Sequence, residues 1–152
     1  MGTPADADQL ASLSAVIDGW LDEELATNPA VLAVERDVEG PGTWYVRLGG
    51  EAKEYSGVLF RLGQRTLRFE TYFMPAPEEN QAQLYEHLLR RNGSLYGASF
   101  VIGDEDAIYL QGRLDHALVT PDELDRILGS LYAWVEQCFL PALKIGFASR
   151  FA

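Results

Sequence analysis

The chain has few residues that carry covalent or metal chemistry. It contains one cysteine, Cys138, so no disulfide can form within it, and a reducing compartment is consistent with this. Its two histidines, His87 and His116, do not belong to an H-x-x-x-H motif, and there is no C-x-x-C motif. The sequence therefore predicts no metal site and no cofactor.

Signatures of the common enzyme classes are also absent. There is no G-x-S-x-G motif, no Walker loop and no G-x-G-x-x-G motif. Glu78, Glu79 and Glu86 are the nearest approach to a catalytic carboxylate pair. Such a pair needs two different pKa values, whereas glutamates at the start of a helix are all held as anions by the helix dipole. We therefore interpret Glu78 and Glu79 as helix-stabilising residues and expect no enzymatic activity.

Basic residues are scarce. Twelve Lys and Arg face 23 Asp and Glu, so the net charge is −11, which argues against nucleic acid or an anionic membrane as a main partner. No apolar run approaches the roughly 18 residues of a membrane span. The first ten residues also lack the charged and apolar regions of a signal peptide. These absences predict a cytoplasmic protein without a membrane partner.

Apolar residues make up 47% of the chain, which is enough for one packed core. We predict a flexible N-terminus over residues 1–7 and a single domain over residues 8–152. Helical spacing predicts a first helix that ends at Asn28-Pro29, and a charged helix at 78–91 after Pro75 and Pro77. A capping box at Thr120–Glu123 begins the last helix, which Pro141 kinks or ends. Alternating apolar residues predict strands at 31–38, 43–48, 55–62, 66–74, 98–102 and 107–114.

The expected order is α-ββββ-α-ββ-α. Because the strands come in hairpins, we predict an α+β fold with an antiparallel sheet flanked by helices.

Aromatic residues are abundant for one small core. Alternation places Tyr45, Tyr72 and Tyr109 on the outer faces of their strands. Exposed aromatic patches mark interfaces. With Tyr85 and Tyr96, these residues are our predicted partner or dimer surface.

Three arginines, Arg61, Arg65 and Arg68, surround one predicted hairpin. Two interpretations stay open. Together they form an anion site, or they pair across strands with acids such as Glu70, Glu54 and Glu51 and stabilise the sheet.

Several segments resemble the YbjN family, in its actinobacterial branch. The resemblance is densest at Gln64–Leu67, Glu70–Tyr72, PAPEEN at 75–80, LLRRN at 88–92, DEDAIYL at 104–110 and LDRILG at 124–129. That family is similar in fold to class I type III secretion chaperones, small acidic homodimers of order α-β-β-β-α-β-β-α. Our expected order has one strand more before the middle helix. Either one bent strand has been split, or the first strand is an edge addition.

The resemblance implies a non-enzymatic chaperone-like or regulatory protein that binds a partner polypeptide as a homodimer, and it supplies no catalytic residues. The alternative is a sensor of a small anionic ligand, or an enzyme with an unrecognised site. A third possibility is a structural subunit of a larger complex.

Overall fold

The computed structural model describes residues 2–152. Four strands precede the middle helix, so the predicted order α-ββββ-α-ββ-α is confirmed. The elements are α1 (Ala7–Thr27), β1 (Val31–Arg36), β2 (Thr43–Gly49), β3 (Tyr55–Leu62), β4 (Thr66–Met74), α2 (Gln81–Asn92), β5 (Ser99–Ile102), β6 (Ile108–Asp115) and α3 (Pro121–Gly146). Short 3₁₀ turns lie at Asp104–Asp106, His116–Leu118 and Ala148–Phe151.

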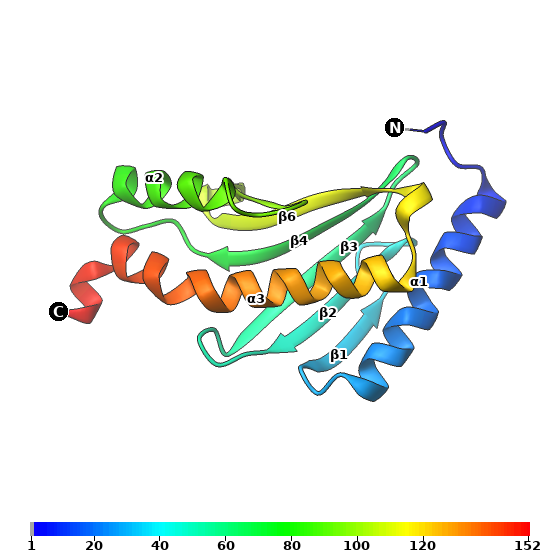
Figure 1. Cartoon of the computed structure of the whole chain (residues 1–152), viewed down its shortest axis with the longest axis horizontal. Coiled ribbons are helices and arrows are strands. Elements are labelled where there is room, and N and C mark those ends of the chain that lie inside the picture. The colour runs from blue at the N-terminus through cyan, green and yellow to red at the C-terminus, as the bar shows by residue number, and fades with distance from the viewer. Residues whose placement is uncertain (1) are drawn as a thin grey trace.

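The six strands form one antiparallel sheet in the order β1-β2-β3-β4-β6-β5. The first strand, β1, therefore lies at an edge of the sheet. This agrees with the interpretation that the extra strand is an edge addition. The other edge is β5, which pairs only with β6. In Figure 1, α3 crosses the front of the sheet, α1 runs beside β1, and α2 lies near β6, so the helices occupy one side.

The core lies between the inward strand faces and the helices. The sequence alternates in β2 and β4 because one face of each strand is buried, as at Val46 and Phe69. Two indole groups also attach α1 to its neighbours. Trp20 Nε1 donates to Asp125 Oδ1 of α3 at 2.6 Å, and Trp44 Nε1 of β2 donates to Asp18 Oδ1 of α1 at 2.8 Å.

The middle helix begins three residues later than the sequence predicts. Glu78 and Glu79 were expected in its first turn, but α2 begins at Gln81 after Asn80, whose φ of 56° is left-handed. Both glutamates instead bind the C-terminal segment. Glu78 pairs with Arg150 at 2.7 Å, and Glu79 accepts hydrogen bonds from Ser149. The capping interpretation was therefore wrong, because a distant part of the chain supplies the partners.

Two further boundaries differ from the prediction. The last helix continues through Pro141 to Gly146, so Pro141 does not end it. Pro141 is exposed, so water can satisfy the carbonyl that loses its backbone donor. At the other end of the chain, β1 stops at Arg36 because Asp37 takes a left-handed φ of 57°.

Residues 5–7 fall within the segment assigned to a flexible N-terminus. The Ala5 amide donates to the Gln64 carbonyl at 2.8 Å, and Asp6 forms a capping box with Gln9. Helix α1 then begins at Ala7.

Candidate functional site

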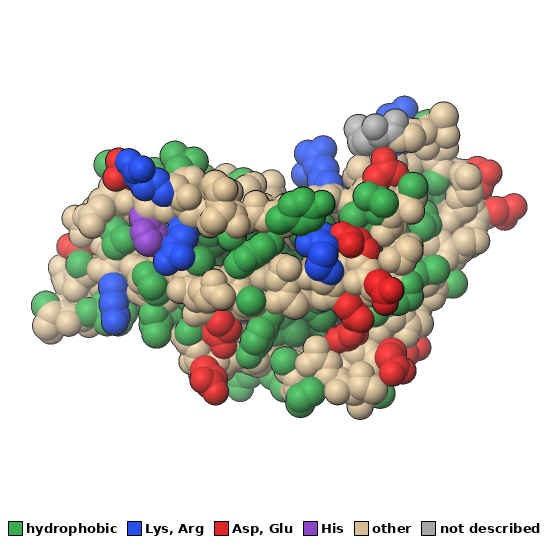
Figure 2. All heavy atoms as spheres, in the orientation of Figure 1, with side chains coloured by type: hydrophobic (Ala, Val, Ile, Leu, Met, Phe, Trp, Pro, Cys, Tyr) green, Lys and Arg blue, Asp and Glu red, His purple; other side chains and the backbone are tan. Residues whose placement is uncertain are grey.

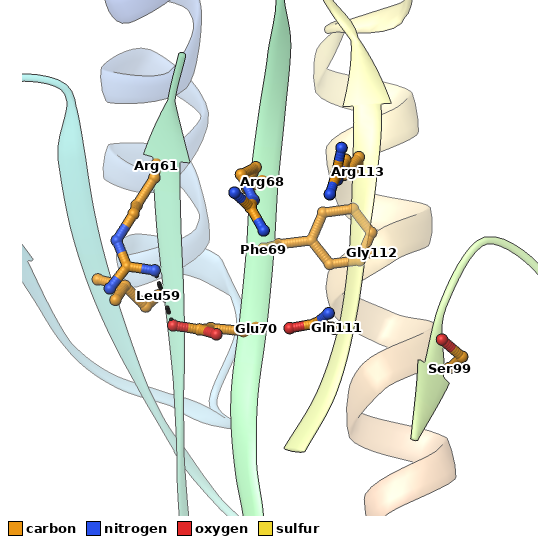
Figure 3. A pocket seen from close by; sticks show the side chains of 9 residues that line it. All are labelled: Leu59, Arg61, Arg68, Phe69, Glu70, Ser99, Gln111, Gly112 and Arg113. Carbon is orange, nitrogen blue, oxygen red and sulfur yellow. Dashed lines mark hydrogen bonds and ion pairs between the residues drawn. The ribbon is translucent and has the colours of Figure 1, made fainter. Parts of the chain in front are cut away.

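The candidate site is the face of the sheet that the helices leave open. Alternate residues of the central strands point away from the core, and among them Tyr45, Arg47, Arg68, Tyr72 and Arg113 are exposed. Figure 3 views part of this face, with the helices behind the strands. We call these outward residues of β2, β3, β4 and β6 the open face.

A hollow of about 500 Å³ lies on the open face. Tyr72 and Tyr109 face each other in register on β4 and β6, with ring centroids 5.6 Å apart in an edge-to-face arrangement. Tyr72 is 43% exposed, a large fraction for an aromatic ring in the middle of a sheet. The remaining lining residues are Tyr45, Arg47, Lys53, Tyr55, Ser56, Gly57, Leu59 and Glu70. We call this feature the tyrosine hollow.

A glycine shapes one wall of the tyrosine hollow. Gly57 of β3 stands next to Arg47 in register, and the Tyr45 ring lies over it. A Cβ at position 57 would overlap that ring. The absence of a side chain at Gly57 thus lets the Tyr45 ring lie close to the backbone of β3.

Lys53 also borders the tyrosine hollow, and its amine has a lowered pKa. Its Nζ donates to the Tyr72 carbonyl at 2.6 Å and lies 5.2 Å and 5.6 Å from the ring centroids of Tyr72 and Phe139. Burial against these groups lowers the pKa of Lys53 to about 8. A substantial fraction of this amine is therefore neutral in mildly alkaline solution.

Next to the tyrosine hollow, three arginines stand side by side. Arg61 of β3 is opposite Arg68 of β4, and Arg68 is opposite Arg113 of β6. Figure 3 shows them around a smaller hollow of about 190 Å³, with Glu70 and Gln111 one row below. We call Arg61, Arg68 and Arg113 the arginine row.

The charges of the arginine row are balanced unevenly. Arg61 binds Glu39 and Glu70, each at 2.8 Å, and these carboxylates raise its pKa. Arg68 and Arg113 are both exposed, and within residues 2–152 neither has a carboxylate within 4 Å. Arg68 and Arg113 are like charges directly opposite one another, an arrangement that disfavours the sheet, and together they form a positive patch on this face.

Arg65 does not join the row. It lies at the β3–β4 turn and borders a separate hollow with Asp6, Gln9 and His116. The predicted trio therefore divides, with Arg61 and Arg68 together and Arg65 apart. The sequence did not predict the third member of the row, Arg113. Strands β4 and β6 are neighbours in the sheet, but α2 and β5 separate them along the chain, so local sequence does not show that Arg113 lies opposite Arg68.

The five predicted tyrosines occupy three places. Tyr45, Tyr72 and Tyr109 meet in the tyrosine hollow. Tyr85 of α2 borders an apolar groove of about 310 Å³ against β5, together with Leu88, Leu89, Phe100, Val101, Ile102 and Ile108. Tyr96 lies between α2 and β5, 74% exposed, with the Arg126 guanidinium 4.9 Å from its ring.

The histidines lie in different environments. His116 Nε2 is 2.8 Å from the Gly63 carbonyl oxygen. His87 lies on α2, where burial and the nearby Arg91 lower its pKa. Within residues 2–152, no three His, Cys, Asp or Glu side chains gather as a metal site would require.

Acidic side chains gather on one part of the helical side of the molecule. Figure 2 shows acidic side chains gathered over α1 and the neighbouring end of the molecule. The arginine row thus stands out on a chain of net charge −11. No helix among residues 2–152 is long and apolar enough to cross a membrane.

The fold is similar to that of a protein from a type III secretion system. The structure superposes on a chain of the heterodimeric ExoU–SpcU complex from the type III secretion system of Pseudomonas aeruginosa, with a TM-score of 0.54 and 16% identity. The match covers 83% of this chain and 96% of that one. Residues 15–140 match the model of the YbjN family, described as "Putative bacterial sensory transduction regulator". The chain belongs to the YbjN family.

Mycobacterial proteins are among its relatives. The uncharacterized protein Rv0487 of Mycobacterium tuberculosis is 35% identical over 109 residues, which cover 72% of this chain and 60% of that protein. The uncharacterized protein ML2442 of Mycobacterium leprae is 35% identical over 104 residues, covering 68% and 56%. The chain thus spans about 60% of the length of these relatives.

Proposed function

We propose that this protein is a non-enzymatic, chaperone-like or regulatory protein that binds a segment of a partner polypeptide on the open face. The observation that carries the proposal is the tyrosine hollow in the middle of an uncovered sheet. Tyr72 and Tyr109 present apolar rings with polar hydroxyls, which suits a wet protein interface. The cytoplasmic location stays a prediction.

The similarity to a chain of the ExoU–SpcU complex supports the proposal by analogy. That structure is, by its description, a heterodimeric complex, so a member of this fold associates with another protein there. Fold similarity alone is a weak guide to function. The proposal therefore depends mainly on the exposed aromatic rings of this chain.

We further propose that the protein is a homodimer, in which a second copy covers the groove between α2 and β5. Leu89 and Ile102 border this groove with 69% and 53% of their surfaces exposed. The free edge of β5 lies alongside. This groove is separate from the open face, so self-association leaves the tyrosine hollow accessible.

Selection from a random peptide library tests polypeptide binding. Displayed peptides are selected on the wild-type protein and then measured against the variant Tyr72→Ala/Tyr109→Ala. Removing both rings removes two of the four aromatic side chains that line the tyrosine hollow, so we expect the selected peptides to bind at least tenfold more weakly. The control variant Leu25→Ala changes an exposed apolar residue of α1 and should leave binding unchanged. Failure to enrich any peptide would contradict the proposal.

A further inference from the structure

We propose that the arginine row binds carboxylate side chains, and that the polypeptide on the open face carries an acidic residue there and an aromatic or aliphatic residue in the tyrosine hollow. This inference rests on the proposed function, because it names the chemical class of the segment that would be bound.

The row already binds carboxylates within the molecule. The Arg61 guanidinium contacts both oxygens of Glu39 and, through its other Nη, one oxygen of Glu70. Arg68 and Arg113 present the same planar group on the next two strands. A guanidinium matches the geometry of a carboxylate through two parallel hydrogen bonds. Arg68 and Arg113 can therefore bind a carboxylate in the way that Arg61 already binds Glu39.

Polar groups on both sides of the arginine row limit how many acidic residues of the bound polypeptide it can accept. Glu70 stands one row away, opposite Gln111, and its carboxylate is bound to Arg61. On the other side Thr66 is opposite Asp115, whose carboxylate accepts the Ala117 amide. The positive patch is therefore one row wide with a carboxylate on each side. A single acidic side chain, or two alternate ones, suits it better than a polyanion such as nucleic acid.

The two parts of the open face have a defined spacing. Arg68 and Tyr72 are four residues apart on β4, which is about 13 Å along a strand. Leu59 and Glu70 line both hollows, so the surface between them is continuous. An extended segment along the strand direction would place its acidic and aromatic residues four positions apart. Alternate side chains of such a segment point to the same side.

The peptides selected on the wild-type protein provide the test. We expect them to share an Asp or Glu four residues from an aromatic or aliphatic residue. The variant Arg68→Gln/Arg113→Gln should bind them at least tenfold more weakly, and the same peptides with Gln or Asn in place of the acid should lose a similar factor on the wild type. These two losses should not add, since both remove one interaction.

Two variants control for loss of positive charge. Arg65→Gln alters the neighbouring hairpin outside the row, and Arg90→Gln alters α2; both should bind the peptides as the wild type does. If peptides are enriched but lack acids, or bind the Arg68→Gln/Arg113→Gln variant equally well, the inference is overturned and polypeptide binding stands. If no peptide is enriched, the proposed function fails first. An equal loss with Arg65→Gln would point to general charge and would also overturn the inference.

Discussion

Lys53 shows how one side chain of the open face acquires chemistry that its residue type does not predict. The chain has two lysines, Lys53 and Lys144. Burial beside Tyr72 and Phe139 lowers the pKa of Lys53 to about 8. The sequence offered no sign of this, because the two rings come from β4 and α3 and approach Lys53 only in the folded chain.

At pH 8 about half of the Lys53 amines are neutral and able to attack an acylating reagent. We expect a limiting amount of such a reagent to modify Lys53 before Lys144, with the preference diminishing toward pH 10.5, where ordinary lysines also lose their protons. Peptide mapping by mass spectrometry measures both sites in one sample. Equal modification at pH 8 would contradict the lowered pKa.

The lowered pKa of Lys53 also determines how the free energy of unfolding changes with pH. Since the folded state holds its Lys53 proton less tightly than the unfolded state, the unfolded chain binds more protons between pH 8 and 10.5. The Lys53 contribution to the free energy of unfolding therefore rises as the pH increases through that window.

Gly57 is the second test at the scale of single residues. The variant Gly57→Ala forces the Tyr45 ring off the sheet, so we expect a loss of about 1 kcal/mol in the free energy of unfolding and weaker peptide binding. Gly129→Ala is the matched control, since Gly129 lies in α3 and an alanine Cβ there would have no neighbouring atom within 4 Å. It should stabilise the protein by about 1 kcal/mol. Chemical denaturation measures both, and equal signs would argue against the role of Gly57.

At the scale of elements, the strands and their order follow from the sequence because each has one buried face and a clear turn beside it. In β2, for example, buried Trp44, Val46 and Leu48 alternate with exposed Tyr45 and Arg47. Local patterns of this kind need no knowledge of the rest of the chain.

The features that escaped prediction depend on contacts between distant segments. Glu78 pairs with Arg150, which is 72 residues away, so no local rule places it outside α2. The arginine row likewise requires the register of β4 on β6, which the intervening α2 and β5 conceal. Sequence reasoning found Tyr45, Tyr72 and Tyr109 by alternation, but it found only two of the three arginines that stand together.

Pro141 offers a test of helix α3. It interrupts the backbone hydrogen bonds of a 26-residue helix at an exposed position. We expect Pro141→Ala to raise the free energy of unfolding by about 1–2 kcal/mol, less than the full interior penalty because the unfolded chain gains freedom. Thermal and urea unfolding measure the change. A destabilised variant would mean that the fold depends on the local geometry that proline imposes.

At the scale of the whole molecule, one side of the sheet forms the core with the helices and the other side stays open. The groove between α2 and β5 is a second uncovered surface at the far edge. Two uncovered surfaces on one small domain suit a protein that associates with itself through one and with a partner through the other.

The homodimer is tested at the groove. The variant Leu89→Glu places a charge among apolar side chains, so we expect it to be a monomer in sedimentation velocity while the wild type sediments as a dimer. Leu25→Glu on α1 is the control, since Leu25 is also exposed, and it should remain dimeric. A monomeric wild type would contradict the homodimer and leave the open face untouched.

The most direct test of the central claim, that the open face binds a polypeptide, is site-specific photo-crosslinking in cells. A photoreactive amino acid replaces Tyr72 on the open face or Leu25 on α1. We expect discrete adducts with another polypeptide from position 72, reduced in the Arg68→Gln/Arg113→Gln background, and little from position 25. Adducts from position 25 with none from position 72 would contradict the claim.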